Sequence, residues 1–371
     1  MMTRRNLLAR GAAGLAALHI SGGAAMAGGY TSSAKSAGFR FPLESDPHLR
    51  TFMQWPSRKS IYGSMDALNE VREKIALIAK SIAKFEPVVM LARPEQMADA
   101  QDFMKTGVEL LPIETEDLWC RDSGPSFVVN AKGELACTEF NFNGWGDKQS
   151  HKDDGRIARR CAEKLGMTIF DNGLVGEGGG VEVDGQGTAM AHASCWVNKN
   201  RNPGSQEEVG KLMLDALGAE KMIWAPGIKD ADITDYHIDA LARFVKPGQV
   251  LIQLPDKVDQ NDPWSVSAFE TYEILKEATD AQGNKLDIVV IPSPVDIRSE
   301  NKDFVSSYVN YYVCNDAVIG AEFGDDKADE QAARILGQLY PGREIVSLNV
   351  DPIGEAGGGI HCSTQQQPKG A

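Results

Sequence analysis

The stretch with the clearest chemical potential lies near the C-terminus, where the glycines Gly357–Gly359 lead into Ile360, His361 and Cys362. Glycines let the backbone pass close to a ligand or adopt a positive φ, and here they deliver one thiol after a short apolar, strand-like segment. A thiol held there could act as a nucleophile. The alternative is a buried structural cysteine beside a glycine turn, and this stretch alone leaves the question open.

A nucleophile needs a proton carrier and a substrate cradle, and five polar residues elsewhere in the chain could supply them: Asp122, Glu177, His237, Asp239 and Asn310. Several carboxylates without a lysine or a zinc-ligand pattern would form a pocket for a cation. A planar guanidinium is the cation that two carboxylates hold in a paired, bidentate way. Cysteine with histidine supplies a nucleophile and a proton carrier. The set therefore predicts hydrolysis of a guanidino carbon–nitrogen bond.

Structural roles compete with each of these interpretations. Asp122 could form a surface ion pair with Arg121, although the Ser-Gly-Pro that follows predicts a turn that presents the aspartate. His237 and Asp239 could be half of a metal site, but no further ligands occur at suitable spacing, and no metal is expected. Glu177 could simply cap a glycine turn, and Trp119 could be a core residue. Asn310 could equally have a structural role. An aromatic wall beside a cation is the functional alternative for the tryptophan.

The candidates occupy equivalent places in a repeated unit. After a strand–helix–strand unit over residues 51–91, four predicted hairpins follow at a period of roughly 55–70 residues, each with polar groups at its start. The hairpins span 127–140, 181–191, 237–252 and 306–319, and the helical patterns between them span 154–165, 206–217, 267–278 and 326–339.

A repeated strand–strand–helix–strand unit can stack into a solenoid or close into a ring. A solenoid would scatter the polar hairpin starts along a line, whereas a closed ring would bring all of them to one central cavity. Because the candidate residues make chemical sense only together, we expect an α/β fold of five modules arranged in a ring.

Six motifs, in order along nearly the whole mature chain, resemble those of the agmatine deiminase and bacterial peptidyl-arginine deiminase family. The motifs are Trp119-x-Arg121-Asp122-x-Gly124-Pro125, Glu177-Gly178-Gly179, Asn200-Arg201-Asn202-Pro203, His237-x-Asp239, Ser307-Tyr308-x-Asn310 and Gly357-Gly358-Gly359-Ile360-His361-Cys362-x-Thr364-Gln365-Gln366. The resemblance implies the pentein fold, a five-bladed α/β propeller of ββαβ repeats, in agreement with the repeat count.

The resemblance also implies roles for single residues. Cys362 would be the nucleophile, His237 the general acid and base, and Asp122 and Asp239 the guanidinium ligands; substrate contacts are expected from Trp119, Glu177 and Asn310 as well. The thiolate would attack the guanidinium carbon, ammonia would leave, and water would release a ureido product from the covalent adduct. No metal or organic cofactor is implied.

Agmatine is the expected substrate, because Trp119, Asn202-Pro203 and the C-terminal glutamines follow that branch of the family most closely. Tyr236 and Ala240 depart from the agmatine deiminase pattern, which has glycine and asparagine there. Deimination of free or peptidyl arginine to citrulline is the first alternative. An amidinotransferase or a non-catalytic guanidinium-binding protein are alternatives from other classes.

Composition sets broad limits on partners. The chain has 371 residues, 42% of them hydrophobic, and a formal net charge of −14, which disfavours nucleic acid and anionic membranes and mildly favours cationic ligands. No membrane span is expected, and a homo-oligomer stays open. The six cysteines show no disulfide or zinc spacing, so Cys362 is expected to be free.

The N-terminus is expected to be an export signal. Arg4 and Arg5 precede an apolar segment that runs to Ile20, and Ala25-Met26-Ala27 has the small-x-small form of a signal peptidase site. The pattern is typical of a twin-arginine signal peptide over residues 1–27 and predicts a periplasmic enzyme. A linker over 28–38 and one catalytic domain over 39–371 would follow.

Overall fold

The computed structural model describes residues 33–105 and 107–370. The expected signal peptide, and the linker up to residue 32, lie outside the described residues. Residues 33–38 form a turn that packs on the domain: Ala34 is fully buried in a cluster with Phe170, and the Lys35 amide donates to the carbonyl of Asp215 at 3.0 Å. This end of the expected linker therefore belongs to the folded unit.

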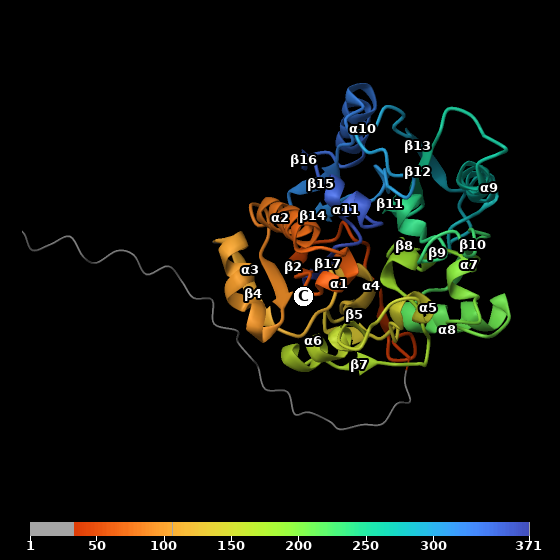
Figure 1. Ribbon diagram of the computed structural model, residues 1–371. Helices are drawn as coiled ribbons and strands as arrows, with labels where there is room; N and C mark the ends of the chain where they lie inside the picture. The colour runs from red at the N-terminus through yellow and green to blue at the C-terminus, as the bar shows by residue number, and fades with distance from the viewer. Residues whose placement is uncertain (1–32, 106, 371) are drawn as a thin grey trace, which may run out of the picture.

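Five small sheets make up the fold (Figure 1). In each sheet the first and second strands are antiparallel, and the second and third are parallel. The sheets are β5(Ser126–Asn130)-β6(Leu135–Thr138)-β7(Ile169–Phe170), with β1(Phe39–Arg40) beside β5; β8(Val181–Val183)-β9(Thr188–His192)-β10(Lys221–Ala225); β11(Ala242–Lys246)-β12(Gln249–Leu254)-β13(Asp287–Pro292); β14(Tyr312–Cys314)-β15(Ala317–Ala321)-β16(Glu344–Leu348); and β17(Thr364–Pro368)-β2(His48–Gln54)-β3(Val88–Ala92)-β4(Val108–Pro112).

A helix lies in each crossover from the second to the third strand, because parallel strands need a long connection that also covers one face of the sheet. These helices lie on the outside of the ring (Figure 1). They are α2(Met65–Ile82), α6(Ile157–Leu165), α8(Gln206–Leu217), α9(Pro263–Glu277) and α10(Asp326–Leu339). Shorter helices are α1(Lys59–Tyr62), α3(Met97–Met104), α4(Cys120–Ser123), α5(Gly144–Asp147), α7(Ala193–Trp196) and α11(Asp351–Glu355), with 3-10 turns η1(Pro94–Gln96), η2(Asp154–Arg156), η3(Gly178–Gly180) and η4(Ile238–Ala240).

Local sequence explains these helices well. Helix α8 begins with a capping box in which Ser205 and Glu208 each accept a backbone amide of the other, and it ends at Gly218 in the left-handed conformation (φ 62). Helix α2 buries Val71, Ile75 and Ile78 at helical spacing against the adjoining sheet, in one of several apolar clusters between helices and sheets.

The C-terminal strand closes the ring. Strand β17 pairs with β2 in antiparallel fashion, so that Gln365 lies opposite Phe52, and the last strand completes the blade that the N-terminal strands began. The five-module ring predicted from the repeats is confirmed. Each polar segment singled out from the sequence lies directly before the innermost hairpin strand of a blade, which brings all five segments to one end of the central axis.

Two details differ from the predicted strands. Residues 360–363 form a turn, and the strand begins only at Thr364. Likewise, His237 lies before the 3-10 turn η4, and β11 begins at Ala242. Turns hold these side chains at the sheet ends, where the backbone is free of ladder hydrogen bonds and can bend toward the axis.

Candidate active site

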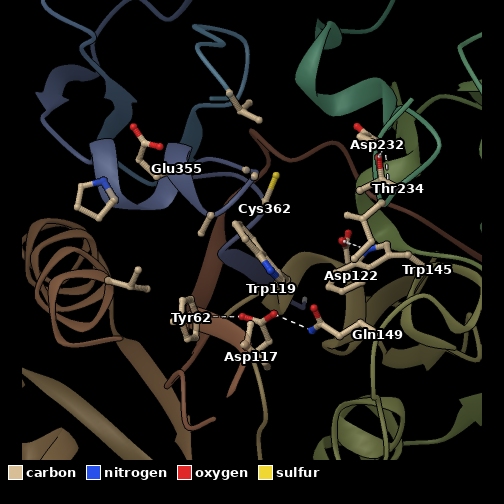
Figure 2. A pocket seen from close by; sticks show the side chains of 18 of the residues that line it. Tyr62, Asp117, Trp119, Asp122, Trp145, Gln149, Asp232, Thr234, Glu355 and Cys362 are labelled. Atoms are coloured by element: carbon tan, nitrogen blue, oxygen red, sulfur yellow. Dashed lines mark hydrogen bonds between the residues drawn. The ribbon is translucent and has the colours of Figure 1, made fainter. Parts of the chain in front are cut away.

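A cavity of about 510 Å³ opens at the end of the axis where these turns meet (Figure 2). Four of the residues predicted to do chemistry line it together: Asp122 before β5, His237 and Asp239 before β11, and Cys362 before β17. Trp119 forms part of the same wall, beside Cys362 and Asp122. The geometry therefore gathers a thiol, an imidazole and two carboxylates from three blades.

Cys362 is held by Asn310. The Asn310 amide nitrogen donates to the Cys362 sulfur at 3.1 Å, and the Asn310 side-chain oxygen accepts the Cys362 backbone N–H at 3.3 Å. The backbone at Gly359 passes so close that a Cβ there would lie 2.4 Å from the Asn310 oxygen. Asn310 is not among the described residues that line the cavity, and its side chain instead holds Cys362; a substrate contact of Asn310 stays a prediction.

The two carboxylates are held differently. Asp122 accepts the Gly179 backbone N–H on Oδ1 at 3.0 Å and the Trp145 indole N–H on Oδ2 at 2.9 Å. Asp239 is fully buried, and its Oδ2 accepts from the Cys362 thiol at 3.6 Å. Its Oδ1 is buried and has no hydrogen-bond partner within residues 33–105 and 107–370. A buried acceptor without a partner is costly, which makes this oxygen a good place for a ligand N–H.

Glu177 supports His237 from behind. Its Oε2 lies 3.2 Å from His237 Nε2, and both of its oxygens accept from Arg201 Nε, at 2.8 and 3.0 Å. Glu177 is fully buried and does not line the cavity. In this structure Glu177 holds one side of the imidazole, while His237 Nδ1 faces Asp122 Oδ1 at 3.7 Å; a substrate contact of Glu177 stays a prediction.

Gly179 lies where the side chains of Asp122, His237 and Asp239 meet. A Cβ on this residue would lie 2.8 Å from both Asp122 Oδ1 and His237 Nδ1, and 3.1 Å from Asp239 Oδ2. Only a hydrogen atom fits among these three side chains, which explains physically why the segment after Glu177 needs glycine.

The charges of the site control its protonation. Burial raises the pKa of Asp122 to about 6, helped by Asp239 and Glu177 and opposed by His237. Burial alone would lower the pKa of His237, but Asp122, Glu177 and Asp239 outweigh it and raise that pKa to about 9. Burial, Asp239 and Asp122 raise the pKa of Cys362 well above its usual value. Near neutral pH the empty site thus holds a thiol beside an imidazolium.

Sequence reasoning missed Trp145, which lines the cavity and donates to Asp122. Its backbone is in the left-handed region (φ 57), which is uncommon for a bulky residue and here turns the indole toward the site. The signal that could have found it is the Gly144-Trp145-Gly146 sequence, in which glycines flank a large aromatic residue. Sequence reasoning also missed His361, which contacts Asp239, and Glu44, which contacts His361.

Within residues 33–105 and 107–370, no group of three or more histidine, cysteine, aspartate or glutamate side chains could hold a metal ion, and no helix is long and apolar enough to cross a membrane. All six cysteines are free, as predicted for Cys362, and that thiol is half-buried while the other five are buried.

Comparison with known proteins agrees with this geometry. The family model of the Porphyromonas-type peptidyl-arginine deiminase matches residues 40–368. An agmatine deiminase of Pseudomonas aeruginosa is 34% identical over 364 residues, covering 91% of this chain and 98% of that protein. The solved agmatine deiminase of Enterococcus faecalis superposes with a TM-score of 0.84 at 30% identity, covering 91% of this chain and 98% of that one.

The chain belongs to the Porphyromonas-type peptidyl-arginine deiminase family. The predicted family, the pentein α/β fold and a hydrolase that acts on guanidino carbon–nitrogen bonds are confirmed.

Tyr236 and Ala240 depart from the agmatine deiminase pattern, and both lie close to the cavity residues His237 and Asp239 in the chain. Tyr236 adopts φ 71, a conformation that favours glycine, and its ring packs edge-on against Trp264 with centroids 4.6 Å apart. Ala240 lines the cavity with a methyl group. The first departure therefore affects the backbone that carries His237, and the second changes the polarity of the cavity wall.

Proposed function

We propose that this deiminase hydrolyses agmatine to N-carbamoylputrescine and ammonia. The observation that carries the proposal is the charge of the cavity wall. The wall includes several carboxylates, and no lysine or arginine occurs among the described residues that line it. These carboxylates belong to Glu70, Asp117, Asp122, Asp232, Asp239, Asp351 and Glu355.

This wall suits a ligand with a cation at each end. Agmatine carries a guanidinium, a methylene chain and an ammonium, whereas free arginine adds an α-carboxylate beside its amine. The carboxylates of the wall repel an added carboxylate, and His237 is the one side chain with a positive charge near neutral pH among the described lining residues. Apolar side chains such as Ile61, Ile233 and Val305 line the cavity and offer a surface for the methylene chain. Names of relatives that refer to agmatine support the same choice.

The deep end of the cavity would take the guanidinium. Asp239 Oδ1 is free to accept one N–H, and the oxygens of Asp122 can accept another beside their existing partners. Two carboxylates then face the planar cation in a bidentate manner, with the Cys362 sulfur next to Asp239. The bound cation would offset the two negative charges that raise the pKa of Cys362, so that substrate binding favours the thiolate.

The thiolate would attack the guanidinium carbon, and His237, which is protonated in the empty site, would give its proton to the departing nitrogen as ammonia leaves. A covalent amidino thioether-type adduct on Cys362 remains. The neutral His237 then takes a proton from water as the water attacks the adduct. Cleavage of the carbon–sulfur bond releases the ureido product and returns the thiol. Glu177 keeps the imidazole oriented throughout.

Side-by-side assays of ammonia release test the substrate. We expect kcat/KM for agmatine to exceed that for free arginine by about 100-fold or more, because like charges placed together cost several kcal/mol and about 1.4 kcal/mol is tenfold. A peptide with arginine at its C-terminus keeps the α-carboxylate and has an amide in place of the ammonium, so it should also be a poor substrate. Equal or higher efficiency with arginine or with the peptide would refute agmatine as the substrate.

We further propose a periplasmic setting for the enzyme. Arg4 and Arg5, the apolar segment after them and the Ala25-Met26-Ala27 site support export by the twin-arginine route. These residues lie outside the described part of the chain, so the support is the sequence pattern alone.

Replacing Arg4 and Arg5 together by lysine keeps the positive charge but removes the pair that the export receptor reads. Cell fractionation should then show unprocessed chain accumulating inside the cell. Arg10→Lys, the same exchange outside the pair, is the matched control and should be exported normally. Mature protein starting near Gly28 in the periplasm of the double variant, at wild-type level, would contradict the proposal.

A further inference from the structure

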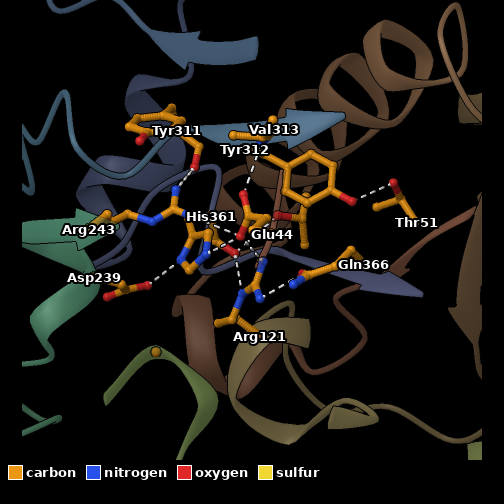
Figure 3. A network of polar contacts seen from close by, with 12 residues as sticks. Glu44, Thr51, Arg121, Asp239, Arg243, Tyr311, Tyr312, Val313, His361 and Gln366 are labelled. Carbon is orange, nitrogen blue, oxygen red and sulfur yellow. Dashed lines mark hydrogen bonds and ion pairs between the residues drawn. The ribbon is translucent and has the colours of Figure 1, made fainter. Parts of the chain in front are cut away.

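A second group of buried charges lies next to the catalytic carboxylates, around the same axis (Figure 3). It contains the carboxylates Glu44 and Glu182, the guanidinium groups of Arg121 and Arg243, and His361. Their distances show tight pairing: Arg243 lies 2.7 Å from Glu44 and 3.0 Å from Glu182, and Arg121 lies 3.1 Å from Glu44. None of the five lines the catalytic cavity.

His361 connects this group to the catalytic site. Its Nδ1 lies 2.7 Å from Asp239 Oδ2, and its Nε2 lies 2.8 Å from Glu44 Oε2 (Figure 3). Only 2% of His361 is exposed, so water does not compete for these contacts. A continuous chain of contacts therefore runs from Glu44 through His361 to Asp239, and from the same Asp239 oxygen to the Cys362 sulfur.

Both carboxylates that contact His361 are held in the ionised form. Burial alone would raise the pKa of Glu44, but Arg243, His361 and Arg121 outweigh it and hold that pKa well below its usual range. Burial would likewise raise the pKa of Asp239, but His361, His237 and Arg243 lower it. Each ring nitrogen of His361 therefore faces a carboxylate that accepts hydrogen bonds, and the charge of His361 is one of the causes that lower both carboxylate pKa values.

We propose that His361 is a positioning residue that keeps Asp239 ionised and turns its free Oδ1 toward the guanidinium of the substrate. Glu44 holds the ring of His361 from the opposite side. The proposal rests on the proposed function, because it gives Asp239 the role of guanidinium ligand.

Other charged groups also act on Asp239, but none replaces His361. The cations His237 and Arg243 lower its pKa without a hydrogen bond to its carboxylate, and the carboxylates Asp122 and Glu182 oppose ionisation. The Cys362 thiol donates to the same oxygen as His361, at the longer distance of 3.6 Å. By occupying Oδ2 at 2.7 Å, His361 leaves Oδ1 as the oxygen without a partner among the described residues.

The test is the pH dependence of kcat/KM for agmatine in His361→Asn. The asparagine amide can still donate from the place of Nδ1, but the positive charge is gone, so the pKa of Asp239 should rise. From the pKa of Asp122 we expect an acidic limb near 6 in the wild type. In the variant we expect this limb to move up by about one pH unit and to steepen as two carboxyls titrate. KM should rise about tenfold at neutral pH and recover at higher pH.

A second substitution separates the two contacts of the ring. In His361→Gln the longer amide can donate to Glu44 from the place of Nε2 but no longer donates to Asp239. The KM of this variant for agmatine should therefore rise more than that of His361→Asn. We expect an alkaline limb near 9 from His237, and this limb should stay in place in both variants. A purely structural role would lower the melting temperature and the rate at every pH alike, and would not produce this order.

His48→Asn is the matched control. His48 is equally buried and pairs with the buried Glu86 at 3.0 Å, but it does not contact Asp239. This variant should lose stability while both limbs stay in place. An unchanged acidic limb in His361→Asn, an equal shift in His48→Asn, or failure of both His361 variants to fold would overturn the proposal. Wild-type protein active on arginine but not on agmatine would refute only the substrate, and the profiles would then be measured with arginine.

Discussion

Replacing Cys362 by alanine is expected to abolish ammonia release, by a factor on the order of 10⁴ or more, while agmatine still binds. The sulfur is the only group lost, and it is half-buried at a cavity wall, so its removal costs little packing. Binding should persist because Asp122 and Asp239 keep their charge and orientation. Ammonia assays and calorimetric titration with agmatine measure the two effects separately.

Cys314→Ala is the control for this variant. Cys314 is buried in the core, where its thiol donates to the Ala317 carbonyl at 3.4 Å, and it does not line the cavity. This variant should lose some stability but keep its activity. An acid quench of the wild type should also trap an adduct on the peptide that contains Cys362. If Cys362→Ala kept a tenth of wild-type ammonia release, Cys362 would not be the nucleophile.

Substituting Gly179 by alanine should have the second largest effect, a loss of kcat/KM of about 100-fold or more, because a displacement near 1 Å in a catalytic site can cost that much. The added methyl group would lie 2.8 Å from Asp122 Oδ1 and His237 Nδ1, closer than real contacts allow. The imidazole and the carboxylate must therefore move apart. The measurement is steady-state kinetics together with thermal unfolding.

Gly320→Ala provides the comparison. Gly320 lies in β15, and a Cβ there would meet only Leu336 Cδ1, at an ordinary distance of 3.7 Å. Both substitutions add one methyl group, but only the one at Gly179 enters the catalytic site. Comparable activity in the two variants would contradict the crowding argument and show that the site tolerates the displacement.

The repeats and the four central catalytic candidates could be predicted from the sequence, because the patterns that reveal them lie within short stretches of consecutive residues. Hairpin turns, helical periodicity and glycine runs are properties of consecutive residues, and the order of the polar segments within each unit showed that a ring would bring them together. Asp122, His237, Asp239 and Cys362 do line one cavity.

The sequence could not show whether Glu177 and Asn310 contact the substrate or hold other residues of the site. Both belong to segments that reach the axis, but one side chain turns behind His237 and the other against the Cys362 sulfur. Which way a side chain turns depends on the space left by other blades. For Glu177 that space is decided by Arg201, and for Asn310 by the close passage of Gly359.

The sequence by itself determined the family, the five repeated units and the residues able to do the chemistry, since these follow from residue types and their spacing. Only the tertiary structure decided that Trp145 holds Asp122 and that Glu44 contacts His361, which is 317 residues away in the chain. It also decided that the cavity wall gathers several carboxylates but no lysine or arginine among the described residues that line it. Such contacts arise from ring closure, which brings distant segments together at an axis where burial strengthens every charge interaction.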